Sequence, residues 1–70
     1  MDIKIGDLFL DAYEEEDRLG YVVSETKMVQ NSKYRFVRYF SSSVPNTTFI
    51  IPEIEISHLI QRLERYMEKA

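Results

Sequence analysis

The sequence predicts a small, mostly β domain of the α+β class with one helix at its C-terminal end. Two observations lead to this fold class. Residues 8–51 contain short runs rich in β-branched and aromatic residues, separated by turn residues, as is typical of antiparallel strands. After residue 56 the apolar side chains recur every three or four positions, as is typical of an amphipathic helix. A chain of 70 residues holds one domain, so we predict a single domain over residues 1–70.

The first three strands follow from alternation and turn chemistry. After Gly6, Leu8 and Leu10 fall on one side and Asp7, Phe9 and Asp11 on the other, which predicts a strand over residues 8–12. Residues 21–29 are rich in β-branched residues and are predicted to be a second strand. Residues 30–33 supply turn residues, with Asn31 able to adopt a left-handed conformation. A third strand is then predicted over residues 34–40, forming a hairpin with the second strand.

The third strand carries apolar and cationic side chains on both faces. Successive side chains of a strand point to opposite sides, so one face presents Tyr34, Phe36, Arg38 and Phe40, and the other presents Arg35, Val37 and Tyr39. We therefore expect both faces to be partly covered. A polar loop over residues 41–46 leads to a fourth strand over residues 47–51, which Pro52 ends because proline cannot donate to a strand ladder.

A single apolar stripe predicts the C-terminal helix. Its members share the spacing of one helix face and are Ile56, Leu59, Ile60, Leu63 and Met67. Ser57 is the predicted N-cap, because its hydroxyl can accept from a free amide of the first turn. The helix is thus predicted over about residues 57–69, and Tyr66 and Met67 at its far end could extend to a second copy in a homodimer.

Charge is distributed unevenly along the chain. The first 17 residues hold seven acidic residues against one lysine, whereas residues 18–49 hold five basic residues against one acidic residue, within a formal net charge of −3. Glu14, Glu15, Glu16 and Asp17 follow Tyr13 and are predicted to form an acidic loop. With Tyr13, they are candidate partner-binding residues for a protein with a basic surface. The alternatives are a merely solvated loop or a Ca²⁺ or Mg²⁺ site, although the run lacks the spacing of an EF-hand.

Several classes of function find no support in the sequence. The absence of cysteine excludes disulfides and cysteine zinc sites, and no apolar run reaches the length of a membrane span, so we expect a cytoplasmic protein. Ser57 and His58 are adjacent, which does not give the converging groups of a catalytic triad. There is no glycine-rich phosphate loop. We therefore predict a protein that is not an enzyme and that uses no cofactor or metal.

The order of the elements resembles a known family of small barrels. A Gly-Asp pair enters a strand at residues 6–8, a glycine precedes a valine-rich strand at residues 19–23, a hairpin strand follows at residues 34–40, and a Pro-Glu turn ends residues 49–53. Over residues 5 to about 56 this order resembles SH3-like barrels of the KOW and Tudor kind, which implies four to five antiparallel strands and a role as a binding module. KOW modules are usually basic where this chain is acidic, so RNA binding is not implied.

Two further patterns concern ligands. Tyr34, Arg35, Phe36, Arg38 and Tyr39 interleave rings and guanidinium groups, which suits stacking on bases and contact with phosphates of single-stranded nucleic acid. An aromatic cage for a methylated cation would need converging rings, and the candidate rings are Tyr13, Tyr21, Tyr34 and Tyr39. We predict a protein-binding module, an adaptor or inhibitor that docks on a larger, nucleic-acid-processing machine and could be phage-encoded; the alternative is a single-stranded nucleic-acid binder.

Overall fold

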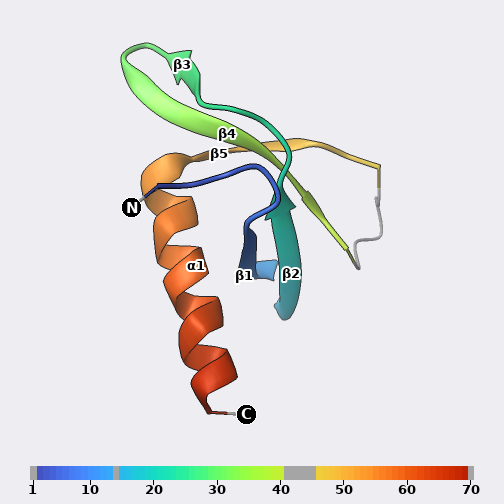
Figure 1. Cartoon of the computed structure of the whole chain (residues 1–70). Coiled ribbons are helices and arrows are strands. Elements are labelled where there is room, and N and C mark those ends of the chain that lie inside the picture. The colour runs from blue at the N-terminus through green and yellow to red at the C-terminus, as the bar shows by residue number, and fades with distance from the viewer. Residues whose placement is uncertain (1, 14, 41–45, 70) are drawn as a thin grey trace.

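The computed structural model describes residues 2–13, 15–40 and 46–69. Within them, one antiparallel sheet precedes a single helix (Figure 1). The elements in chain order are β1 (Leu8–Tyr13), β2 (Glu16–Val22), β3 (Lys27–Val29), β4 (Ser32–Tyr39), β5 (Phe49–Pro52) and α1 (Glu53–Glu68). The predicted fold class, a small α+β domain of mostly antiparallel strands with one C-terminal helix, is confirmed.

β4 is the central strand of the sheet. β2 pairs with its second half, β3 pairs with its first half along the same edge, and β5 pairs with the other edge, while β1 pairs with β2. β2 and β3 thus act as one strand interrupted at residues 23–26, where the sequence predicted a continuous strand. The cause is Ser24, whose hydroxyl accepts the Phe36 amide at 2.9 Å and so takes the place of a backbone partner.

In both hairpins the strand pairing extends further than predicted. Tyr13 pairs directly with Glu16, and Glu15 has a φ of 64°. The prediction of a loop over residues 13–17 is therefore wrong, because Glu16 and Asp17 belong to β2. In the second hairpin, Gln30 and Asn31 have φ of 48° and 69°. The predicted left-handed Asn31 is confirmed, and the two residues match the turn type that suits twisted strands.

The hydrophobic core lies between the sheet and α1. Paired strand residues share a face, and the face toward the helix, called here the inner face, carries Phe9, Gly20, Val22, Val37, Tyr39 and Ile51. Ile56 of α1 completes this core, with Leu59 and Ile60 packed against it. Edge-to-face ring contacts at 5.8 and 5.5 Å place Tyr39 between Phe9 and Phe49.

The helix begins four residues earlier than predicted. α1 starts at Glu53, and its N-cap position is held by Pro52 with a φ of −59°, so Ser57 is not the cap but lies within the helix. Proline is compatible with a helix start because its fixed φ is already helical, and the acidic Glu53 and Glu55 favour the first turn. The strands accordingly end at residue 52, whereas the sequence prediction extended the strand region to about residue 56.

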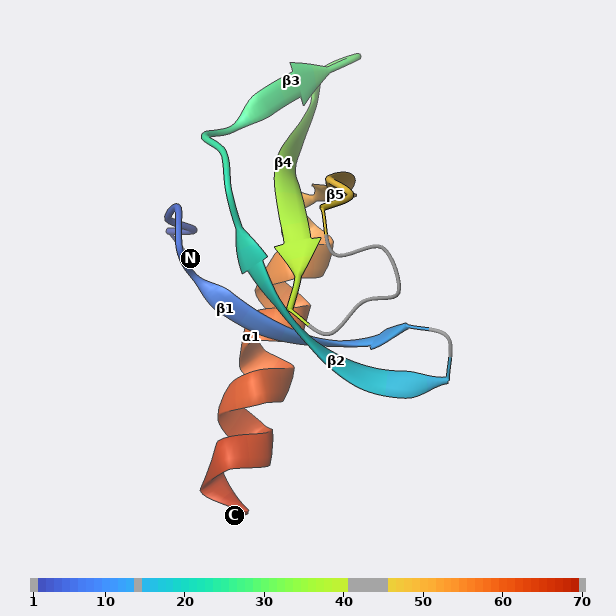
Figure 2. The same cartoon turned by 90° about the vertical axis from the view of Figure 1, so that its right-hand side faces the viewer.

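The far end of α1 extends beyond the sheet. The helix packs mainly against β1, and its last turns continue past the strands (Figure 2). Within the predicted apolar stripe Ile56 is buried, Leu59, Ile60 and Leu63 are half-buried, and Met67 is 66% exposed. No helix in the described ranges combines the length and the apolar character needed to cross a membrane.

Candidate functional site

The sheet face that points away from α1 carries a cluster of large side chains. Cross-strand pairing places Leu8 opposite Tyr21 and Tyr21 opposite Arg38, and places Phe36 opposite Ile50. Phe40 follows β4 and joins this face through ring contact with Tyr21. We call Leu8, Tyr21, Phe36, Arg38, Phe40 and Ile50 the outer-face cluster.

Much of the apolar surface of this cluster is open to solvent. Leu8 is 42% exposed, Ile50 is 47% exposed and Phe40 is 56% exposed. The Tyr21 and Phe40 rings lie 4.7 Å apart with a tilt of 35°. In Figure 2 the helix lies behind the sheet, and none of the described helices or strands covers the opposite face. Several exposed apolar side chains on one sheet face of a small domain are typical of a site of interaction.

Cationic groups accompany the exposed rings. The Nε of Arg38 donates to the Thr48 hydroxyl at 3.1 Å, and Lys27 Nζ lies 5.8 Å from the centroid of the Phe36 ring. The outer-face cluster contains no acidic side chain. Its chemistry is therefore apolar and aromatic with a positive charge, which suits a partner that offers apolar side chains beside a carboxylate.

On the inner face, Arg35 is a structural residue. Its side chain is 8% exposed, and its Nε donates to Glu53 Oε2 at 2.6 Å. Its Nη1 donates to the Ser24 carbonyl at 3.1 Å and its Nη2 to the Ile3 carbonyl at 2.8 Å. The Thr26 hydroxyl also donates to Glu53 Oε2 at 2.6 Å. We call this set of five residues the Arg35 clamp.

The clamp fixes the ionisation of Glu53. The hydrogen bond from Thr26 lowers the pKa of this carboxyl below its usual value of 4.5, and the hydrogen bond and charge of Arg35 lower the pKa further, against an opposing effect of burial. A carboxylate at the helix start is thereby tied to β4, to the segment between β2 and β3, and through Arg35 to the N-terminal segment.

The predicted nucleic-acid residues are divided between the two faces. Arg35 is buried in the clamp, and Tyr39 is 4% exposed and donates its hydroxyl to Asp11 Oδ2 at 2.7 Å. Neither is therefore accessible to a nucleic acid, which corrects the sequence prediction for these two positions. Tyr34, Phe36 and Arg38 remain partly exposed.

The predicted aromatic cage does not form among the tyrosines whose side chains are described. Tyr21 lies on the outer face and Tyr39 on the inner face, so their rings cannot converge on one cation. Tyr34 pairs with Lys27 and Pro52, at the other end of β4 from Tyr39. Tyr13 is the last residue of β1, and its side chain lies outside the described part of the structure, as does Glu14.

The acidic hairpin is less isolated than the sequence suggests. Glu15, Glu16 and Asp17 are exposed, but Glu16 Oε2 pairs with Arg18 at 3.4 Å and Asp17 Oδ1 pairs with Arg62 of α1 at 2.7 Å. The run predicted to dock a basic partner thus already contacts a cation of its own helix. In the described ranges, no three His, Asp or Glu side chains are grouped as metal ligands.

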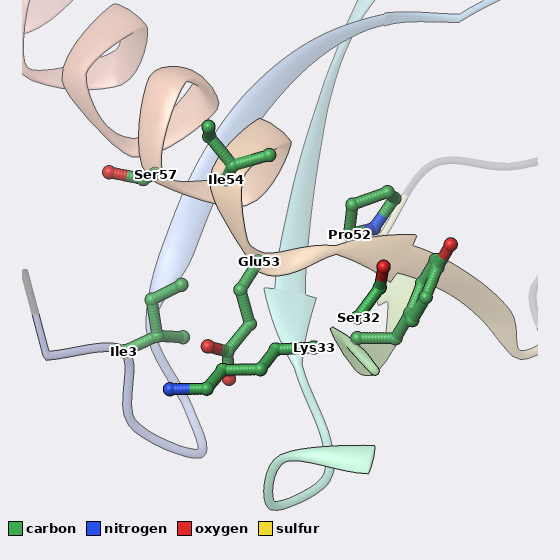
Figure 3. A pocket seen from close by; sticks show the side chains of 8 residues that line it. Ile3, Ser32, Lys33, Pro52, Glu53, Ile54 and Ser57 are labelled. Carbon is green, nitrogen blue, oxygen red and sulfur yellow. The ribbon is translucent and has the colours of Figure 1, made fainter. Parts of the chain in front are cut away.

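A groove of about 640 Å³ lies beside the clamp (Figure 3). Its lining comes from the N-terminal segment, β4, β5 and the first turn of α1, and consists of Ile3, Ser32, Lys33, Tyr34, Pro52, Glu53, Ile54 and Ser57. In Figure 3 the Lys33 side chain runs beside the Glu53 carboxylate. Glu53 Oε2 already accepts hydrogen bonds from Arg35 and Thr26. The Glu53 side of the groove is therefore part of the Arg35 clamp, and we assign it a structural role.

Sequence reasoning identified half of the outer-face cluster. The alternation of β4 placed Phe36, Arg38 and Phe40 on one face, but Leu8, Tyr21 and Ile50 were missed because they come from other strands. The pairing register was the missing signal. Ser57 and His58 occupy consecutive helix positions, which point about 100° apart, so they give no nucleophile and base pair.

The fold and surface together define a small α+β domain with an exposed aromatic sheet face. Comparisons with protein-family models, with curated proteins and with solved structures found no match to this chain. The resemblance to SH3-like barrels of the KOW and Tudor kind therefore stays a prediction.

Proposed function

We propose that the protein is a non-enzymatic protein-binding module whose contact surface is the outer-face cluster. The observation that supports this most strongly is that one sheet face carries Leu8, Phe40 and Ile50, each more than two-fifths exposed, together with a Tyr21–Phe40 ring contact. Aromatic and arginine side chains are the groups that dominate binding energy at protein interfaces. An exposed row of such groups contributes little to the fold and is costly to leave in water.

The charge on this face defines the chemistry of the partner. Arg38 uses Nε on Thr48, and its two terminal nitrogens have no side-chain partner within the described residues. A guanidinium beside aromatic rings is suited to a carboxylate in a bidentate arrangement. The expected partner is a protein segment with apolar side chains next to Asp or Glu, as on a larger machine that this small chain would dock on and modulate.

Single-stranded nucleic acid is the second candidate for the same face. The Tyr21, Phe36 and Phe40 rings with Arg38 and Lys27 nearby could stack bases and meet phosphates. Two features favour the protein partner instead. Arg35 and Tyr39 are buried, and the formal net charge of the chain is −3, which disfavours a polyanion.

Selection from a random peptide library on the immobilised protein tests the proposal. We expect enriched peptides to combine apolar and acidic residues. Their affinity is expected to fall about tenfold or more in a Tyr21→Ser, Phe40→Ser double variant, because it removes the ring pair. Met28→Ser is the matched control, since Met28 is 61% exposed but belongs to β3 and not to the cluster. No enrichment, or enriched peptides that bind the double variant as tightly as the wild type, contradicts the proposal.

Titration with an oligothymidylate separates the two candidates. We expect no saturable binding at an ionic strength of about 0.15 M. Micromolar binding that weakens steeply with salt and is lost in Arg38→Ala would support the nucleic-acid candidate instead, because counterion release gives phosphate contacts this salt dependence. Lys4→Ala is the control for a general loss of positive charge.

A further inference from the structure

A second charged surface lies at the opposite end of the molecule from the Arg35 clamp. The C-terminal half of α1 and the β1–β2 hairpin enclose a groove of about 320 Å³, lined by Leu10, Asp17, Arg62, Arg65, Tyr66 and Lys69. The four helix residues follow the spacing that places side chains on one face. We call this the α1 groove; its lining holds three cations and one acid.

The cations of the α1 groove differ in whether they have hydrogen-bond partners. Arg62 donates through Nη2 to Asp17 Oδ1 at 2.7 Å and through Nη1 to the Leu10 carbonyl at 3.3 Å, which fixes it against the hairpin. Arg65 and Lys69 are both exposed, and neither has a side-chain partner among the described residues. Tyr66, between them, is 59% exposed. Two uncompensated charges and a ring thus face solvent on one side of the helix end.

The opposite charge lies immediately beside this groove. Asp17 forms its rim, and Glu15 and Glu16 continue to the tip of the same hairpin, where both are exposed and Glu16 also pairs with Arg18 at 3.4 Å. An acidic patch next to a basic patch on one surface is self-complementary, because rotation of a second copy by 180° places each patch against its opposite. Charge complementarity therefore favours a second copy of this chain as the occupant.

We propose that the protein forms a two-fold symmetric homodimer in which the acidic hairpin of each copy docks against the α1 groove of the other. Glu15 and Glu16 then meet Arg65 and Lys69 twice across the axis, and Tyr66 supplies an apolar contact beside them. The basic partner expected for the acidic run is, on this proposal, the helix of the same protein. The interface is mainly electrostatic, so the dimer is salt-sensitive.

Sedimentation of the full chain at ionic strengths of about 0.05 M and about 0.5 M tests this proposal. We expect dimer at the lower salt and a shift to monomer at the higher salt. Arg65→Glu with Lys69→Glu, and separately Glu15→Lys with Glu16→Lys, should each give monomer at low salt, because like charges then face each other. An equimolar mixture of the two variants should restore dimer, since every reversed hairpin meets a reversed groove.

The control and the contradicting outcomes are distinct from those of the peptide test. Lys4→Glu with Lys33→Glu makes the same change in net charge as the groove variant, but near the other end of the molecule, and should sediment as the wild type does. A wild type that is monomeric at low salt, reversed variants that still dimerise, or a mixture that stays monomeric overturns the proposal. None of these readouts involves the outer-face cluster, so the dimer and the binding function fail independently.

Discussion

The two faces of β4 place the same residue type in opposite roles. Arg35 lies on the inner face, is 7% exposed, and makes three hydrogen bonds that join the N-terminal segment, the segment after β2 and the helix start. Arg38, three residues later, lies on the outer face and makes one side-chain hydrogen bond, to Thr48. The first arginine holds the fold together, and the second is available to a partner.

The difference shows what a buried guanidinium requires. Removing its charge from water is favourable only when acceptors replace the lost hydration, and those around Arg35 come from three segments distant in sequence. No comparable set surrounds Arg38. The inner face therefore concentrates stability and the outer face concentrates accessible surface. Substitutions at matched positions on the two faces test this division of roles.

The largest effect is expected from Arg35→Met compared with Arg38→Met. Arg35→Met leaves Glu53 without its cationic partner and should lower the free energy of unfolding by about 3 to 5 kcal/mol, whereas Arg38→Met should change it by less than about 1 kcal/mol. Urea unfolding followed by circular dichroism measures both. Combining Arg35→Met with Glu53→Leu should recover part of the loss, because no unpaired charge remains. Equal losses for the two single variants would refute the division between faces.

A smaller loss is expected from Gly20→Ala on the inner face. A Cβ at Gly20 would clash with the Phe9 ring, so the ring or the strand must shift, at a cost of about 1 to 3 kcal/mol. In a Phe9→Leu background the added cost of Gly20→Ala should be smaller, since the clashing ring is gone. The outer-face neighbour gives the comparison: Tyr21→Thr should cost less than about 1 kcal/mol. Additive costs in the double variant would exclude the contact as the cause.

The smallest expected effect is on the pH dependence of stability, through protonation of Glu53 in the Arg35 clamp. The folded-state pKa of Glu53 is lowered from the value of 4.5, so its contribution to stability is present above that pH and is lost as the pH falls through the folded-state pKa. Unfolding free energies between about pH 6 and about pH 2.5 should therefore fall less steeply in Glu53→Gln than in the wild type. Glu64→Gln, which removes an exposed carboxylate of α1, should keep the slope of the wild type. A parallel curve for Glu53→Gln would contradict the clamp.

Local chemistry explains which elements could be predicted. The Asn31 turn, the alternation of β4 and the apolar spacing of the helix each depend on residues a few positions apart. The interruption after β2 could not be predicted, because it depends on a bond between Ser24 and Phe36 of β4, 12 positions apart in the chain. The sequence predicts Ser57 as the helix N-cap, yet α1 starts at Glu53. The bond of Glu53 to Arg35 holds the first turn at the end of β5, and local sequence does not reveal this bond.

For the candidate site, too, some features could be predicted from the sequence and others could not. The fold class, the cation and ring content of residues 34–40, and the acidic character of the first hairpin follow from the sequence alone. Tertiary packing sets which face of β4 is buried, because strand alternation assigns residues to two faces without naming the one that the helix covers. It also decided that Leu8, Tyr21 and Ile50 join one surface and that Asp17 meets Arg62, since strand pairing and helix packing bring together residues that the chain keeps far apart.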